Sequence, residues 1–268
     1  LIDSDETIVG VDWLNSGTTS AGLSAALSGD IVLPSTPIVD GAIGIIDRGN
    51  GVFTRVCVES GTLVGQVQLE NNPYDVVIIG DQAFATRYNP NTAAADPADA
   101  GSDIIGFDAR TMERNDVRIA FDEFAGEVTG EEAGEPVMVD IAARPAAMRV
   151  VDGHLVVVLE RTQVDQAAAA RGFGEGTVVV IDPETLERTS LTLEGSANCT
   201  QMTAVPGSTD EVYVACKGDS VVAFDGPGTR ETAGIYRLQI AAGAASVVDS
   251  WKPAEEEPNA TYSLIALS

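Results

Sequence analysis

The sequence contains very few basic residues. Lysine occurs only at Lys217 and Lys252, and Lys and Arg together number 15 against 41 Asp and Glu, a formal net charge of −26. Because binding to phosphate backbones requires clustered Lys and Arg, this composition excludes sequence-independent nucleic-acid binding, and it disfavours anionic membrane surfaces. No run approaches the roughly 18 apolar residues that cross a bilayer, so no transmembrane segment is predicted.

Histidine and the common catalytic motifs are also scarce. His154 is the only histidine, which excludes zinc sites with several His ligands and the two-His iron site. The sequence contains no G-x-S-x-G, no P-loop and no C-x-x-C-H. We therefore assign no catalytic residue, and we favour a non-catalytic protein over an enzyme while keeping both readings open.

The residues that are present favour an all-β fold. Hydrophobic residues make up 44% and charged residues 21%, which is typical of a globular chain rather than a disordered acidic one. Short apolar runs rich in Val and Ile alternate with Gly, Asp, Asn and Pro, the pattern of many short strands. We expect one large domain.

Internal repeats define the architecture further. Residues 57–70, 107–121 and 181–194 each resemble a strand, a polar turn and an alternating strand. Residues 72–88, 144–160 and 198–216 share a second pattern, in which two apolar strands flank a turn such as Asp152-Gly153. Together the two units give four antiparallel strands per repeat, the size of a β-propeller blade.

The repeats predict a β-propeller of about five blades, or part of a larger propeller. We place the propeller at residues 30–268, with blades at about 30–70, 72–122, 143–195 and 196–253 and a closing strand at 259–268. Residues 1–29 are expected to be an extended segment that exchanges strands with a neighbouring molecule or helps to close the ring.

About half of the chain resembles a known repeat family. The pattern runs from Pro145 to Val157 and from Ile181 to Glu187, and less fully from Pro73 to Thr86. It is similar to the YVTN-type propeller repeat of surface-layer and lactonase-like proteins. The resemblance implies blades rather than a particular activity.

Two of the three cysteines are arranged as a pair. Cys199 and Cys216 are equidistant from an expected turn at Pro206–Thr209, and directly opposed residues of an antiparallel pair approach to about 4.5 Å. We favour a Cys199–Cys216 disulfide over two buried thiols. A disulfide indicates an oxidising compartment, so we expect an extracellular, cell-surface or periplasmic protein whose signal peptide has been removed before Leu1.

Cys57 is left over from this pairing. It lies in a strand whose alternation places it with Phe53, Arg55 and Glu59 on one face. We expect either a semi-buried free thiol or an intermolecular disulfide.

The dispersed acidity has two explanations, namely solvation in salty or extracellular water and calcium binding. The candidate calcium ligands are Asn91, Asp96, Asp99 and Asp103, in an insertion that is otherwise a mobile acidic loop. Calcium is the only cofactor that the sequence suggests. Residues 122–135, which carry six acids, are expected to form a solvated loop that projects from a blade edge.

Two tripeptides, at Asn198 and Asn259, fit the N-glycosylation pattern. Taken together, the features favour a secreted or cell-surface propeller that acts as a structural or binding module. Its expected partners are other copies of itself, assembled into an oligomer or filament, or another extracellular protein. The alternative is a lactonase-like hydrolase that uses a divalent metal, with Asp75 and Asp140 as acids that face a channel.

Overall fold

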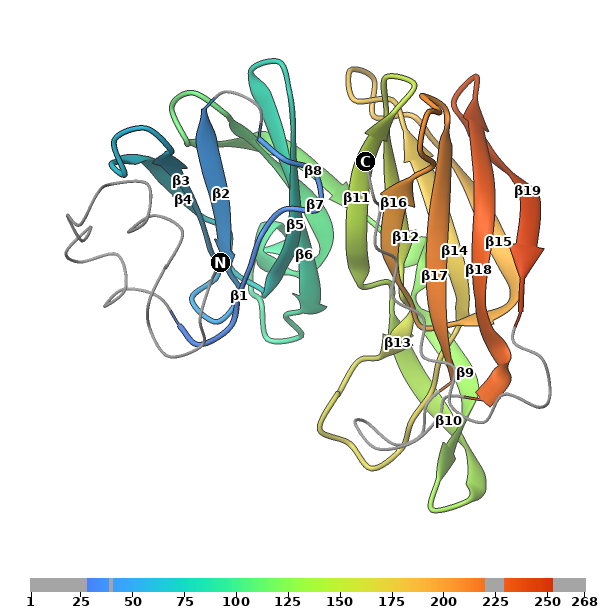
Figure 1. Ribbon diagram of the computed structural model, residues 1–268. Coiled ribbons are helices and arrows are strands. Elements are labelled where there is room, and N and C mark those ends of the chain that lie inside the picture. Colours follow the sequence, from blue (N-terminus) through green and yellow to red (C-terminus); the bar gives the residue numbers. More distant parts are fainter. Residues whose placement is uncertain (1–27, 39–40, 220–228, 253–268) are drawn as a thin grey trace. The chain divides into compact units, whose positions relative to one another are not determined.

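The structure is a computed structural model that describes residues 28–38, 41–219 and 229–252 (Figure 1). It is all-β, as expected, with antiparallel sheets and two short 3-10 helices in the described part. The chain divides into two compact units, residues 1–119 and 120–268, and each is described by itself. No helix among the described residues is long and apolar enough to span a membrane.

Unit 1 contains two four-stranded sheets, with strand orders β1-β2-β3-β4 and β5-β6-β7-β8. The first sheet consists of β1 (Ile31–Val32), β2 (Ala42–Asp47), β3 (Val52–Cys57) and β4 (Leu63–Gln68). The second consists of β5 (Pro73–Ile79), β6 (Gln82–Pro90), β7 (Gly101–Asp108) and β8 (Arg114–Ala120), with the 3-10 helix η2 (Pro97–Asp99) before β7.

Unit 2 contains two more four-stranded sheets and one three-stranded sheet. The four-stranded sheets consist of β11 (Pro145–Val151), β12 (His154–Leu159), β14 (Glu175–Ile181) and β15 (Arg188–Ala197), and of β16 (Cys199–Ala204), β17 (Glu211–Asp219), β18 (Thr229–Ala241) and β19 (Ala244–Trp251). The third sheet has the order β13-β10-β9 and consists of β9 (Gly126–Glu132), β10 (Glu135–Ala142) and β13 (Thr162–Gln163), preceded by η3 (Asp122–Phe124).

Each four-stranded sheet is an antiparallel meander in sequence order, the form of a β-propeller blade. The four sheets lie within residues 31–68, 73–120, 145–197 and 199–251, close to the ranges expected for blades. The three-stranded sheet was not expected. Most of the expected N-terminal segment, the closing strand at 259–268 and Asn259 lie outside the described residues.

The turns between the third and fourth strands repeat in detail. In unit 2, the Asp182 carboxylate accepts hydrogen bonds from the backbone N–H groups of Glu184 and Thr185, and Leu186 adopts φ 61°. In unit 1, Asp108 accepts in the same way from Arg110 and Thr111. An Asp side chain that bonds the backbone ahead of it holds such a turn closed, so these acids serve the fold.

The first strands of three sheets also begin alike. Asn72, Arg144 and Asn198 have φ values of 56°, 50° and 55°, in the left-handed region. Their carbonyl oxygens accept hydrogen bonds from the backbone N–H groups of Tyr88, Glu160 and Lys217. A shift of register follows in each first strand. The chain therefore enters three different sheets through one local conformation.

Each unit has an apolar core between its two four-stranded sheets. In unit 1 the core includes Ile46, Phe53, Val76 and Phe107, with the two phenyl ring centroids 5.8 Å apart. In unit 2 the core joins β11, β12, β14 and β15 to β16, β17 and β18, and it includes both cysteines of the predicted pair. A four-stranded sheet is too small to bury its own faces, so neighbouring sheets supply the cover.

Candidate functional site

The structure contains the disulfide between Cys199 and Cys216. The two residues are opposed at the start of β16 and in β17, with Cα atoms 3.8 Å apart, and both side chains are fully buried. The disulfide that was predicted from the symmetry of the hairpin is therefore confirmed. Because the bond joins two strands of one sheet inside the core of unit 2, its role is structural.

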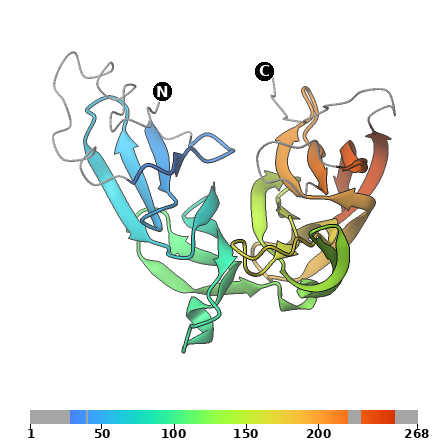
Figure 2. The same ribbon diagram turned by 90° about the horizontal axis from the view of Figure 1, so that it is seen from below.

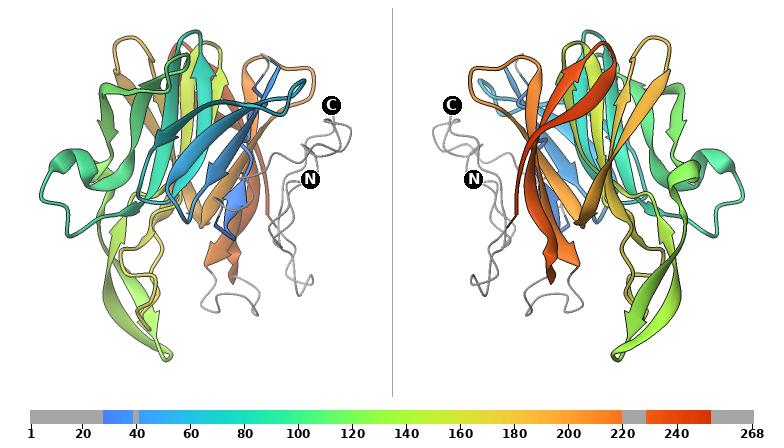
Figure 3. Two further views of the ribbon diagram at one scale, coloured as in Figure 1. Left: turned by 90° about the vertical axis from the view of Figure 1, so that its left-hand side faces the viewer. Right: turned by 90° about the vertical axis from the view of Figure 1, so that its right-hand side faces the viewer.

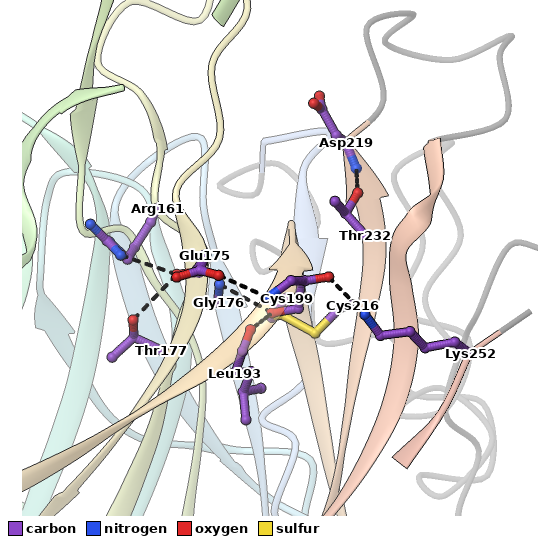
Figure 4. Close-up of a disulfide and its surroundings, with 12 residues drawn as sticks. Arg161, Glu175, Gly176, Thr177, Leu193, Cys199, Cys216, Asp219, Thr232 and Lys252 are labelled. Atoms are coloured by element: carbon purple, nitrogen blue, oxygen red, sulfur yellow. Dashed lines mark hydrogen bonds between the residues drawn. A yellow bond between two sulfur atoms is a disulfide. The ribbon is translucent and has the colours of Figure 1, made fainter. Parts of the chain in front are cut away.

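The disulfide occupies a close-packed site. A Cβ atom at Gly176 would clash with the Sγ of Cys199 and lie 2.8 Å from the Oγ of Ser196. The Ser196 hydroxyl donates to the carbonyl of Leu193, accepts from the Gly176 N–H and lies 3.4 Å from the same sulfur. Glycine is thus required at position 176 for the sulfur to pack against β14 (Figure 4).

Charged side chains around the disulfide bind the backbone of strand ends. The Glu175 carboxylate accepts from the Gly195 N–H at 2.8 Å, and Lys252 donates to the carbonyl of Gly195 at 3.1 Å. Arg161 donates to the carbonyl of Glu175, and burial lowers the pKa of its guanidinium while the Glu175 charge opposes that change (Figure 4). The Glu175 contact joins β14 to β15, whereas Lys252 ties the residue after β19 to β15 and Arg161 ties the residue before β13 to β14.

The expected calcium ligands are not brought together. Asp103 is fully buried and accepts two hydrogen bonds at 2.7 Å from Arg87, which is also fully buried, and one at 2.6 Å from Arg118. Asp96 instead caps η2 by accepting from the Ala98 N–H. Asp103, one of the four expected ligands, is thus held by two guanidinium groups.

The other two candidate ligands serve the same loop. The backbone carbonyl of Asp99 accepts from the Asn71 side chain, and the side-chain oxygen of Asn91 accepts from the Ala93 N–H. Across residues 28–38, 41–219 and 229–252, no three His, Cys, Asp or Glu side chains form a group that could hold a metal ion. The prediction that Asp96, Asp99 and Asp103 converge on a cation was therefore wrong. It was based on the insertion alone, and the residues that bind Asp103, Arg87 and Arg118, lie outside that insertion.

Cys57 is a half-buried free thiol at the end of β3, directly before the turn to β4. The turn has the same backbone bonds as those at Asp108 and Asp182, since the Gly61 N–H donates to the carbonyl of Cys57. Hydrogen bonds from the Ser60 side chain, and then from backbone N–H groups, lower the pKa of the thiol. Cys57 therefore replaces the turn-closing aspartate in this sheet.

The acidic segment expected as a loop is mostly a strand. Residues 126–132 form β9, which pairs with β10 in a hairpin that extends away from the other sheets of unit 2 (Figure 3). Glu127 lies directly opposite Asp140 in this hairpin. Asp219, at the end of β17, has a raised pKa because of burial and the nearby Glu131 charge. The expectation of a loop was wrong because residues 135–142, outside the acidic run, supply the pairing strand.

The remaining candidate residues are placed as follows. Asp75 is buried and accepts from the backbone and hydroxyl of Ser35, whereas Asp140 is exposed on β10. Asn198 is half-buried directly before β16, so it is only partly accessible for glycosylation. The His154 ring nitrogen Nδ1 lies 2.8 Å from the carbonyl of Asp152, a contact within its own turn.

Sequence reasoning missed the buried arginines. Arg87 and Arg144 are almost fully buried, and Arg144 donates to the carbonyls of Gln163 and Val164. The available signal was an arginine within an apolar run, as at residues 83–88, which indicates a buried guanidinium group. Because a buried cation requires a nearby acceptor, an acidic partner such as Asp103 could have been expected.

Comparison with known proteins finds similarity only among solved structures. No family model matches the chain, and no curated protein matches it. Among solved structures, it is similar to a putative 6-phosphogluconolactonase from Bacteroides fragilis (10% identity, 87% of this chain and 74% of that chain, TM-score 0.38). It is also similar to AztD from Citrobacter koseri (11% identity, 87% of this chain, TM-score 0.41), of whose length it spans 60%. A third match is the β-propeller domain of Swd1 from Myceliophteria thermophila (12% identity, 84% of this chain and 75% of that chain, TM-score 0.38).

Proposed function

We propose that this chain is a secreted or cell-surface propeller of the YVTN type that acts as a non-catalytic structural or binding module and assembles with itself. The observation that carries the proposal is the fully buried disulfide between Cys199 and Cys216. Structural disulfides form and persist in oxidising compartments and are rare in the cytosol of most cells. The strong acidity suits the same surroundings, since a large net charge keeps a protein soluble in salty water.

The polar chemistry around the disulfide supports a structural role. Glu175, Arg161 and Lys252 bond to backbone groups at strand ends, and the Ser196 hydroxyl is occupied by backbone atoms and a sulfur. A nucleophile would instead need a neighbouring base within hydrogen-bond reach. The lactonase-like alternative receives less support, because Asp75 is bonded to Ser35 and Asp103 to Arg87 and Arg118.

The test is to follow the protein in its source cells. Cells are lysed in a thiol-alkylating reagent, fractionated, and the chain analysed by mass spectrometry without reduction. We expect the protein in the surface, periplasmic or secreted fraction, with Cys199 linked to Cys216 and Cys57 alkylated. A cytosolic protein with all three thiols alkylated would overturn the proposal.

A further inference from the structure

The hairpin of β9 and β10 has two unlike faces, because side chains alternate along each strand. Figure 2 shows this hairpin from the side of its turn. On one face, Val128 and Val139 lie against Gly172, where an added Cβ atom would come 3.1 Å and 2.8 Å from their side chains. The other face carries Thr129 and Met138, and both are exposed. This second face is therefore available for chemistry with solutes.

Met138 differs from the other methionines in its exposure. The sequence has four methionines, and the structure describes all of them. Met138 is 62% exposed, whereas Met112, Met148 and Met202 are 5%, 0% and 6% exposed. A thioether sulfur is oxidised by peroxides that reach it. Access alone therefore directs a dissolved peroxide to one of the four sulfur atoms.

A hydroxyl group lies directly across the hairpin from this sulfur. Thr129 is the register partner of Met138, and its Oγ1 donates to the Sδ of Met138 at 4.0 Å. A thioether is a weak acceptor, whereas a sulfoxide carries a polar oxygen. Oxidation would thus give the Thr129 hydroxyl a better acceptor at the same place. At a buried methionine the same oxygen would enter an apolar core.

The charges on this face select the class of oxidant. Glu127 and Asp140 face each other in the next same-face pair on one side of Met138, and Glu131 lies in the next such pair on the other side. Such neighbours are about 7 Å apart. None of the three acids forms an ion pair with a basic side chain in the part of the chain that the structure describes. Their charges repel an anionic oxidant and leave a neutral peroxide unaffected.

We propose that Met138 is a modification site that neutral peroxides oxidise to the sulfoxide, and that the Thr129 hydroxyl binds the new oxygen. With hydrogen peroxide, an S–O bond forms at Sδ as the O–O bond breaks. The sulfur loses two electrons, and the second peroxide oxygen takes the remaining proton and leaves as water. Methionine sulfoxide reductases reverse this step, so the site can be used repeatedly. The inference is independent of the proposed function.

The first test measures selectivity on the full chain, with Cys57 alkylated so that its thiol does not react. The protein is treated with hydrogen peroxide, and the oxygen taken up at each methionine is followed by peptide mass spectrometry. Met138 should react at least about tenfold faster than the three buried methionines. In urea all four should react at similar rates, because unfolding exposes them. A native protein in which Met112 or Met202 reacts as fast as Met138 would overturn the proposal.

The second test compares hydrogen peroxide with the anion peroxymonosulfate. At low salt, the double change Glu127→Gln and Asp140→Asn should raise the rate of Met138 oxidation by peroxymonosulfate about threefold or more. The rate with hydrogen peroxide should not change. Added salt should speed the wild type with peroxymonosulfate only, since it screens the carboxylates. Equal responses of the two oxidants would refute the selection by charge.

The third test concerns the hydrogen bond to the sulfoxide. After oxidation, the amides of β9 and β10 should keep their protection from hydrogen exchange in the wild type. In Thr129→Val, oxidation should lower that protection by about threefold or more, because the sulfoxide loses its donor. Thr192→Val, at an exposed position on β15, is the matched control and should behave as the wild type. An oxidised Thr129→Val protein with wild-type protection would refute the role of Thr129.

Discussion

Removing the disulfide should destabilise unit 2 by a calculable amount. The bond closes a loop with a sequence separation of 17, for which the chain-entropy relation gives about 3 kcal/mol at 25 °C. The double change Cys199→Ala and Cys216→Ala should lower the free energy of unfolding of this region by at least about that amount. Loss of two fully buried sulfur atoms from the core adds to the effect.

Hydrogen exchange measured by mass spectrometry locates the effect. Amides of β16 and β17 should exchange faster in the double variant, whereas amides of β5 to β7, in unit 1, should keep their rates. The control is Cys57→Ala, which removes the half-buried thiol of unit 1 and should leave β16 and β17 unchanged. Equal protection of β16 and β17 in wild type and double variant, both without reductant, would refute the reasoning.

Three further predictions concern unit 1 and the repeated turns. Asp103→Asn should lower the free energy of unfolding by about 3–5 kcal/mol, because it leaves the Arg87 charge buried without its partner. Urea titrations measure this change, and an unchanged urea midpoint would contradict the prediction. Two backbone N–H groups lower the pKa of Asp182 from 3.8, so its stabilising effect should be present above pH 4 and be lost as the pH falls below that value. Melting points of wild type and Asp182→Ala should accordingly differ at pH 7 and converge near pH 2, and a constant difference would count against the prediction. The pH midpoint for alkylation of Cys57 should lie below 9.0 and rise in Ser60→Ala, since the Ser60 side chain is the main cause of the lowered pKa.

The fold could be predicted from the sequence because its signals are local. The Asp152-Gly153 turn has the positive φ values, 48° and 77°, that two-residue hairpin loops require. The Asp182 turn and the pairing of Cys199 with Cys216 also depend on residues a short distance apart. Composition and turn residues were sufficient for these features.

The candidate site could not be predicted in the same way, because its partners are distant along the chain. The insertion at 89–103 contains the acids that suggested a calcium site, but Arg87 and Arg118 lie outside it and bind Asp103. The acidic run before Glu135 forms a strand because the following segment pairs with it. Pairing between strands and ion pairs across a sheet are not visible in a single segment.

The meander order of the sheets has a consequence for synthesis of the chain. Within each four-stranded sheet, every strand pairs with the one before or after it in that sheet, so hydrogen bonds form between segments close in sequence. Closing short loops costs little entropy, and domains form progressively as the chain leaves the ribosome. We expect each sheet to form soon after its fourth strand emerges, and the apolar face of β5 to β8 to cover that of β1 to β4 while β11 to β19 are still being made.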